Sequence, residues 1–228
     1  MKYSVRTLTT AATMMAFAST GLAGCASLSN TERGAVIGAT TGAAVGGALG
    51  QRGGSTAKGA IIGAAVGGAA GAIIGRQMDR QREEIDQTVP GATTERVGEG
   101  IYIRFDSGIL FDTDQAQLLG AGRTNLTRLA ESLRRYPESE VLIVGHTDAR
   151  GSDSHNYALS QRRSASARSY LIQQGVAANR IRTEGRGKTE PIATNETAAG
   201  MQQNRRVEVA IFASPEYRER VRRETGTR

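Results

Sequence analysis

The chain is poor in several residue types, and each shortage excludes a class of protein. It contains a single cysteine, Cys25, so no disulfide can form within the chain. Its only histidines are His146 and His155, which leaves a zinc-type site short of ligands, and we expect no metal and no cofactor. It has no tryptophan and 4% aromatic residues. Because its basic residues are spread without interleaved aromatics, the net charge of +7 does not predict nucleic-acid binding.

The N-terminus has the pattern of an exported lipoprotein. Lys2 and Arg6 precede an apolar stretch, and small residues follow up to Cys25, as in a secretory signal peptide. Leu-Ala-Gly-Cys at positions 22–25 resembles a bacterial lipobox, which implies acylation of Cys25, for example by palmitate. The alternative is an ordinary signal peptide with an incidental cysteine. Lipoproteins kept in the inner membrane typically have aspartate where this chain has Ala26, so the resemblance implies the outer membrane. Without the signal, 27 basic and 22 acidic residues give a net charge of +5, which fits an anionic cell envelope.

Residues 34–75 contain an internal glycine repeat. Glycine recurs at every fourth position in two blocks, residues 34–50 and 59–75, with mainly small or apolar residues between. This period places the glycines of a block on one helical face, where another backbone can approach closely. The pattern resembles a glycine-zipper hairpin of two helices, each about 25 Å long against a hydrocarbon core of about 30 Å. It implies membrane association and allows homo-oligomers. The alternative is a flexible Gly/Ala-rich tether, because each glycine costs a helix about 1 kcal/mol relative to alanine.

A strand and the helix after it carry the main candidate site. Residues 141–144 are an unbroken apolar run, typical of a strand buried on both faces, and Asp148 lies just beyond its end. The next segment has Leu159, Ala167 and Leu171 at helical spacing, and Gly175 is placed to cap it. Arg163 falls on the same apolar stripe. An inward-facing arginine needs a partner, and Asp148 can provide one. From geometry alone, a structural Asp–Arg salt bridge and a functional pair are equally good interpretations.

Further residues recur in one order and spacing: Gly145-His146-Thr147-Asp148, Gly151, Asn156, Leu159-Ser160, Arg163, Gly175-Val176, Arg180-Ile181, Gly185, Pro191-Ile192-Ala193, Asn195, Thr197, Gly200 and Asn204-Arg205-Arg206-Val207-Glu208. This pattern resembles the C-terminal domain of the OmpA family, over roughly residues 98–212. In that family the domain binds peptidoglycan without a covalent bond, through the diaminopimelate of the stem peptide. The resemblance implies that Asp148 and Arg163 are the ligand-binding pair. A carboxylate and a guanidinium across a small cleft suit the ammonium and carboxylate on one carbon of diaminopimelate.

The resemblance also implies a set of residues that support the cleft. For Arg205 the alternative role is a brace for the loop that holds Asp148, and Arg206 is expected to face solvent or to pair with a neighbouring strand. His146 is expected to be a hydrogen-bonded structural residue. His155 and Met201 depart from the family, which usually has an aromatic residue and an arginine there. The expected supporting residues are Asp106, Ser107, Gly108, Thr147, Leu159, Asn204 and Arg205.

The remaining patterns predict an α/β fold. The charged residues 76–89 predict a short solvated helix, and residues 93–97 and 101–105 predict a β-hairpin around Gly98-Glu99-Gly100. Asp114 and Gln117 resemble a capping pair that opens a helix. The order of main elements is strand, helix, strand, helix, strand, strand, which is an OmpA-like two-layer sandwich with a mixed sheet. The apolar positions behind this order are Ile101, Ile103 and Phe105, then Leu119, Leu126, Leu129 and Leu133, then Ile181, then Val207, Val209 and Ile211.

We therefore expect a non-enzymatic outer-membrane lipoprotein whose C-terminal domain binds peptidoglycan in the periplasm. Ser160 is not expected to be a catalytic nucleophile, because no histidine is placed in the pattern that goes with a nucleophile elbow. The alternative function is a membrane-associated assembly protein that oligomerises through its glycine zipper, with the wall domain as a brace. The expected parts are a signal peptide (1–24), a lipidated tether (25–33), the glycine-zipper hairpin (34–75), a charged linker (76–97), the OmpA-like domain (98–212) and a charged tail (213–228), solvated and partly helical or disordered.

Overall fold

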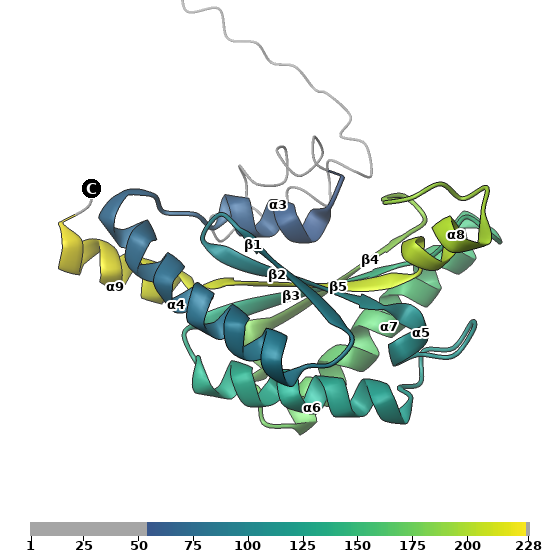
Figure 1. Ribbon diagram of the computed structural model, residues 1–228, viewed down its shortest axis with the longest axis horizontal. Coiled ribbons are helices and arrows are strands. Elements are labelled where there is room, and N and C mark those ends of the chain that lie inside the picture. Colours follow the sequence, from purple (N-terminus) through teal and green to yellow (C-terminus); the bar gives the residue numbers. More distant parts are fainter. Residues whose placement is uncertain (1–53, 227–228) are drawn as a thin grey trace, which may run out of the picture.

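The computed structural model describes residues 54–226, and a five-stranded mixed sheet organises this region (Figure 1). The strands are β1 (Ala92–Val97), β2 (Gly100–Asp106), β3 (Ser139–His146), β4 (Ile181–Gly187) and β5 (Arg206–Ala213). Their order across the sheet is β1-β2-β5-β3-β4. Only β3 and β4 are parallel, and the other neighbours are antiparallel. The predicted fold class and the predicted hairpin are confirmed.

Helices cover both faces of this sheet. The helices are α3 (Thr56–Gly63), α4 (Gly68–Thr88), α5 (Ser107–Leu110), α6 (Gly120–Arg135), α7 (Asp153–Gln173), the 3-10 turn η2 (Ala178–Arg180), α8 (Ala198–Asn204) and α9 (Pro215–Thr225). In Figure 1, α4, α6 and α7 lie on one side of the sheet and α3 lies on the other. The two predicted layers are present, and α3 adds a third, smaller layer.

The alternation of apolar residues explains the two cores. On β2 and β5, Ile103, Phe105 and Val209 face the main core, which also contains Leu126, Leu129 and Leu133 of α6. The intervening positions face α3. There, Ala57 and Ile61 of α3 pack with Tyr102, Val144, Ala210 and Phe212 of the sheet in a separate cluster.

The second glycine block does not form one continuous helix as predicted. It is divided into α3 and the start of α4. Gly67 and Gly68 have φ values of 77° and 61°, a conformation that glycine adopts without strain. The backbone N–H groups of Val66 and Gly67 donate to the Glu99 carboxylate at 2.7 and 2.6 Å. Glu99, in the β1–β2 turn, therefore accepts hydrogen bonds from backbone N–H groups at the break between the two helices.

The last two glycines of this block pack against the β1–β2 hairpin. A Cβ atom at Gly71 would lie 2.0 Å from the Glu99 carboxylate, and one at Gly75 would lie 2.6 Å from the Arg96 guanidinium. Arg96 also donates to the Gly75 carbonyl at 3.0 Å. No helix among residues 54–226 is both long and apolar enough to cross a membrane. The first block, residues 34–50, and Cys25 lie outside the described residues, so pairing of the two blocks stays a prediction.

Three further expectations differ from the structure. The charged segment 76–89 is the second half of α4, and it is not simply solvated, because Met78 and Ile85 belong to the main core. The tail forms α9, and Tyr217 and Val221 of α9 are buried in the same core. Helix α6 begins at Gly120, so Asp114 and Gln117 do not cap it, and Leu119 precedes it half-exposed.

Candidate ligand-binding site

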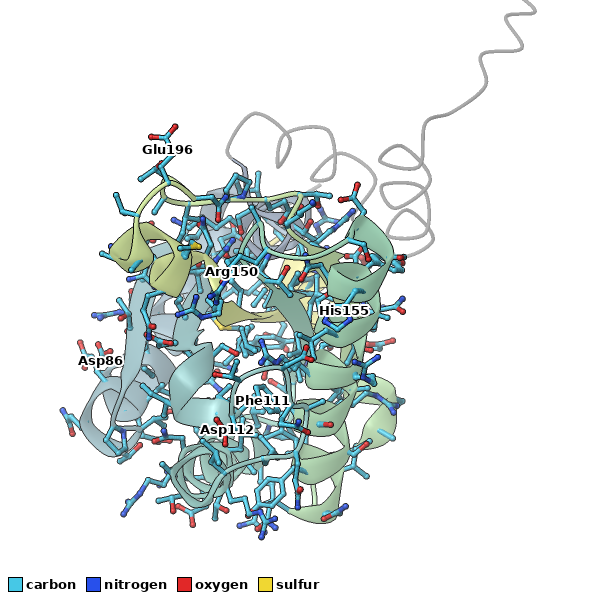
Figure 2. The ribbon with its side chains drawn as sticks, turned by 90° about the vertical axis from the view of Figure 1, so that its right-hand side faces the viewer. Asp86, Phe111, Asp112, Arg150, His155 and Glu196 are labelled. Atoms are coloured by element: carbon cyan, nitrogen blue, oxygen red, sulfur yellow. The ribbon has the colours of Figure 1, made fainter. Side chains whose placement is uncertain are left out.

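The expected site residues gather where β3 ends and α7 begins (Figure 2), on the face that carries Arg150, His155 and Asp112. The two elements can meet because Gly145 has no side chain: a Cβ atom there would lie 2.3 Å from the Ser160 carbonyl oxygen. Thr147 then donates its N–H to the Gly187 carbonyl at 2.9 Å. Strand β4 thereby holds the residue next to Asp148.

Asp148 lies beneath two arginines. Its Oδ2 accepts from Nε and Nη2 of Arg150 at 3.0 and 2.8 Å, and from Nη1 of Arg205 at 2.7 Å. Its Oδ1 accepts the backbone N–H of Arg150 at 3.0 Å. The Asp148 side chain is 7% exposed, against 63% for Arg150 and 27% for Arg205. The carboxylate is thus sheltered mainly by groups that themselves reach solvent.

The charge of Asp148 is fixed by these contacts. Burial by itself raises the pKa of the carboxyl group, but the hydrogen bonds from Arg150 and Arg205 outweigh burial and hold the pKa below its usual range. Asp148 is therefore a carboxylate at neutral pH and presents negative charge to a cation.

Arg163 is buried, as its position on the apolar stripe predicted, and is 3% exposed. Its Nε donates to the Gln115 carbonyl at 2.8 Å and its Nη2 to the Asp112 carbonyl at 3.1 Å. Its guanidinium also lies 5.4 Å from the centre of the Phe111 ring, within the range of a cation–π contact. The partner of Arg163 is thus the loop of residues 112–118.

The structural salt bridge between Asp148 and Arg163 is not formed. The ion pairs of Asp148 are with Arg150 and Arg205. Nη1 of Arg163 makes no hydrogen bond with the described residues. One N–H edge of the guanidinium is therefore available to an anion, while the other two nitrogens fix its orientation.

The same loop has a second attachment to α7. Asp114 has a φ of 55°, an uncommon conformation for a non-glycine residue that aspartate tolerates better than most. Its Oδ1 lies 2.8 Å from Nε2 of His155. His155 of α7 therefore contacts the loop through a polar bond.

The supporting residues lie around this centre. Asp106 accepts from the Gly108 N–H at 2.9 Å and from the Gln202 side chain at 2.7 Å. Ser107 donates its N–H to the Arg205 carbonyl at 2.9 Å. Leu159 is buried in α7.

Asn204 is buried and has a structural role. It binds the backbone N–H groups of Ile192 and Ala193 at 2.8 and 3.0 Å, and the Asn195 side chain at 2.9 Å. Asn195 in turn accepts the Ala149 N–H at 3.1 Å. Asn204 therefore supports the loop next to Asp148 from behind.

Comparison with known proteins identifies the domain. Residues 110–205 match the OmpA family, and residues 1–79 match the YMGG-like Gly-zipper. The peptidoglycan-associated lipoprotein of Mesorhizobium japonicum is 35% identical over 116 residues, which are 51% of this chain and 69% of that protein. This chain belongs to the OmpA family.

Other similar proteins agree with this assignment. The probable lipoprotein YiaD of Escherichia coli is 44% identical over 121 residues, 53% of this chain and 55% of that protein. This OmpA-family chain thus covers little more than half of that relative. The solved cell wall anchor of the T6SS from Pseudomonas aeruginosa is 30% identical, with a TM-score of 0.53 over 60% of this chain and 97% of that chain. A MotB-like protein from Desulfovibrio vulgaris, 22% identical with a TM-score of 0.57 over 63% of this chain and 96% of that chain, shares the fold. As a member of the OmpA family, the chain is not an enzyme.

The OmpA-family domain of this chain also contains a buried charged cluster under α3. Arg206 does not face solvent or a neighbouring strand as expected. It is 1% exposed and donates to Glu208, two residues along its own strand, at 2.7 Å. Glu208 also accepts from the N-cap residue of α3, Ser55, at 2.7 Å. His146 was expected to be a hydrogen-bonded structural residue. It is buried, but its ring nitrogens make no hydrogen bond with the described residues, and its Nε2 lies 3.5 Å from Glu208, too long for a normal hydrogen bond.

These contacts keep Glu208 charged. Burial raises its pKa, but His146, Arg206 and Ser55 outweigh burial and hold the pKa well below its usual range. Within residues 54–226 no cluster of ligating side chains fits a metal ion.

Sequence reasoning missed the residues that contact the expected pair. Arg150 had a local signal, because a residue two positions after an aspartate in a turn often binds that carboxylate through its backbone N–H. Gln115 and Asp112, which bind Arg163, had none. They reach the site through tertiary contacts of their carbonyl oxygens, which no residue type reveals.

Proposed function

We propose that this OmpA-like envelope protein binds peptidoglycan without a covalent bond, through the diaminopimelate of the stem peptide. The observation that carries the proposal is the sheltered, charged carboxylate of Asp148 close to arginine N–H groups. Diaminopimelate has an ammonium and a carboxylate on one carbon, so both charges find complementary groups. The peptidoglycan-associated lipoproteins among the relatives, and a relative whose solved structure is a cell wall anchor, support the same ligand class.

Asp148 and Arg163 have distinct roles in this proposal. Asp148 accepts the ligand's ammonium group. Arg163 offers its Nη1 edge to the carboxylate, and its bonds to the carbonyls of Asp112 and Gln115 hold that edge in place. Two or three charge-assisted hydrogen bonds of about 1.5–3 kcal/mol each correspond to a dissociation constant in the micromolar to millimolar range. A weak contact is sufficient beside a polymer that presents many identical stem peptides.

We further propose that Cys25 is acylated and anchors the chain in the outer membrane, with the OmpA-like domain in the periplasm. The lipobox-like sequence at positions 22–25 and the lipoproteins among the relatives support this. A buried acyl chain contributes about 0.8 kcal/mol per methylene group, so several chains on one cysteine hold it stably. A stable anchor at one end and a weak, reversible contact at the other link the membrane to the wall.

The test is co-sedimentation of the purified chain with isolated wall sacculi, with free meso-diaminopimelate as competitor. We expect the wild type to sediment with sacculi and the competitor to release it. Asp148→Asn keeps the size of the side chain but removes its charge, and it should abolish sedimentation. A folded Asp148→Asn variant that sediments like the wild type would refute the assignment of Asp148.

The alternative, assembly through the glycine zipper, is less well supported for the second glycine block. Gly71 and Gly75 are in contact with Glu99 and Arg96 of the β1–β2 hairpin, so this part of the glycine face is occupied within the domain. Any pairing through the zipper rests on residues 34–50. Crosslinking of the chain in membranes, with leucine at Gly38 and Gly42, tests that possibility.

A further inference from the structure

We propose that Arg150 occupies, in the free protein, the position on Asp148 that the ligand's ammonium group takes, so that binding exchanges one cation for another. This inference rests on the proposed function and adds a specificity-determining residue to it. Both hydrogen bonds of the Arg150 side chain go to Oδ2 of Asp148. That oxygen also accepts from Arg205, so it has no capacity left for a fourth donor.

Arg150 is the cation that can leave. Its side chain is 63% exposed, and the hydrogen bonds and ion pair that this side chain makes within the described residues are all with Asp148. Arg205 is 27% exposed and has a second partner, the Gln202 side chain at 2.6 Å. Exchange at Arg150 therefore breaks contacts with Asp148 alone, whereas exchange at Arg205 would move a side chain that Gln202 also holds.

The backbone around Arg150 stays in place during such an exchange. Its N–H donates to Oδ1 of Asp148 at 3.0 Å, and its carbonyl accepts from the Asn156 side chain at 2.7 Å. Gly151, with a φ of 85°, then turns the chain toward α7. Only side-chain rotation is needed to expose Oδ2, so the exchange does not depend on loop rearrangement. In Figure 2 the labelled Arg150 lies in the upper middle of the viewed face, above Phe111 and Asp112.

The arrangement has a consequence for specificity. A ligand with carboxylates and no ammonium group cannot replace the charge that Arg150 supplies to Asp148, so it leaves the sheltered carboxylate with Arg205 as its one charged partner among the described residues. The exchange also reduces the affinity for the correct ligand, because the apparent dissociation constant rises as the open fraction of the site falls.

The experiment is calorimetric titration of the full-length chain in detergent with meso-diaminopimelate and, separately, with pimelate, which lacks both amino groups. The variants are Arg150→Ala, Arg150→Lys and a matched control, Arg128→Ala. Arg128 is an exposed arginine of α6 that forms no ion pair with Asp148, so its removal changes net charge equally. Arg150→Ala should bind diaminopimelate about two- to five-fold more tightly than wild type, as expected when a largely exposed ion pair is removed from the competition.

The other variants separate the explanations. Arg150→Lys keeps a competing cation with one point of contact and should fall between wild type and Arg150→Ala, while Arg128→Ala should match wild type. Pimelate should bind none of them. In wild-type protein, the Arg150 Nε–H resonance should shift on titration with diaminopimelate.

Two results would overturn the inference in distinguishable ways. If wild type binds diaminopimelate and Arg150→Ala binds it equally or more weakly, Arg150 does not compete with the ligand, and the proposed function still holds. If neither protein binds diaminopimelate, the proposed function fails and the inference fails with it.

Discussion

Removing Asp148 and removing Arg163 should have different effects on stability, although both should abolish wall binding. The reason is that the two side chains do not contact each other in the free protein. Asp148 holds Arg150 and Arg205, both of which reach solvent. Arg163 is 3% exposed and holds the loop of residues 112–118.

The magnitudes follow from these partners. In Asp148→Ala, the two released arginines can be hydrated, so the loss of stability should be no more than about 1 kcal/mol, as for exposed ion pairs. In Arg163→Ala, two buried charge-assisted hydrogen bonds are lost and two carbonyl groups lose their donor. At about 1.5–3 kcal/mol for each such bond, we expect a loss of about 3 kcal/mol or more.

The assay combines urea unfolding, followed by circular dichroism, with sacculus co-sedimentation under conditions where each variant is folded. Arg163→Lys is the matched control, because it keeps the charge but cannot reach both carbonyls with the geometry of a guanidinium. It should recover only part of the stability. Equal stability losses in Asp148→Ala and Arg163→Ala would refute this reasoning, and so would wall binding by folded Arg163→Ala at the wild-type level.

Three further predictions concern the rest of the chain. Glu208→Gln should reduce the free energy of unfolding at pH 7 by about 3–5 kcal/mol, because it leaves Arg206 buried without a charged partner. Since the folded-state pKa of Glu208 is lowered, its contribution is complete above the unfolded value of about 4.3 and is lost as the pH falls below it, so urea unfolding of Glu208→Gln should show a shallower loss of stability in acid. Ile61→Ala, under α3, should increase hydrogen exchange of α3 amides while β3 stays protected, and equal increases in both would argue against a separate α3 core. Cys25→Ala should lose incorporation of radioactive palmitate, and an unlabelled wild type would rule out acylation.

Most of the fold could be predicted because its information is local. Ile103 and Phe105 occupy every second position along β2, and Val209 and Ile211 do the same along β5. Both pairs face the main core. The helix predicted from Leu159 to Leu171 is present as α7, and Gly175 has the positive φ of 89° that its capping position requires. The spacing of apolar residues and the position of a capping glycine define such elements, and both can be seen in the sequence.

The start of α6 could not be predicted in the same way. Asp114 and Gln117 have the spacing of a capping pair, but Asp114 instead contacts His155, which is 41 residues later in the chain. A side chain with the spacing of a helix cap can instead bind a residue far away in the chain, and the spacing alone does not show which of the two interactions forms. The site shows the same limit. The motif indicates Asp148 and Arg163, but the arginines that pair with Asp148 and the carbonyls that Arg163 binds depend on tertiary contacts.

The second glycine block shows how one pattern can serve two structures. A period of four predicts a helix with a flat glycine face, and such a face accepts any close neighbour. In the described region that neighbour is the β1–β2 hairpin, since Glu99 binds the N–H groups at the break before α4 and Arg96 lies against Gly75. Charged partners of this kind are compatible with water and not with hydrocarbon. While these contacts persist, residues 64–75 therefore belong to the wall-binding domain, and insertion of this block into a membrane would first have to break the contacts with Glu99 and Arg96.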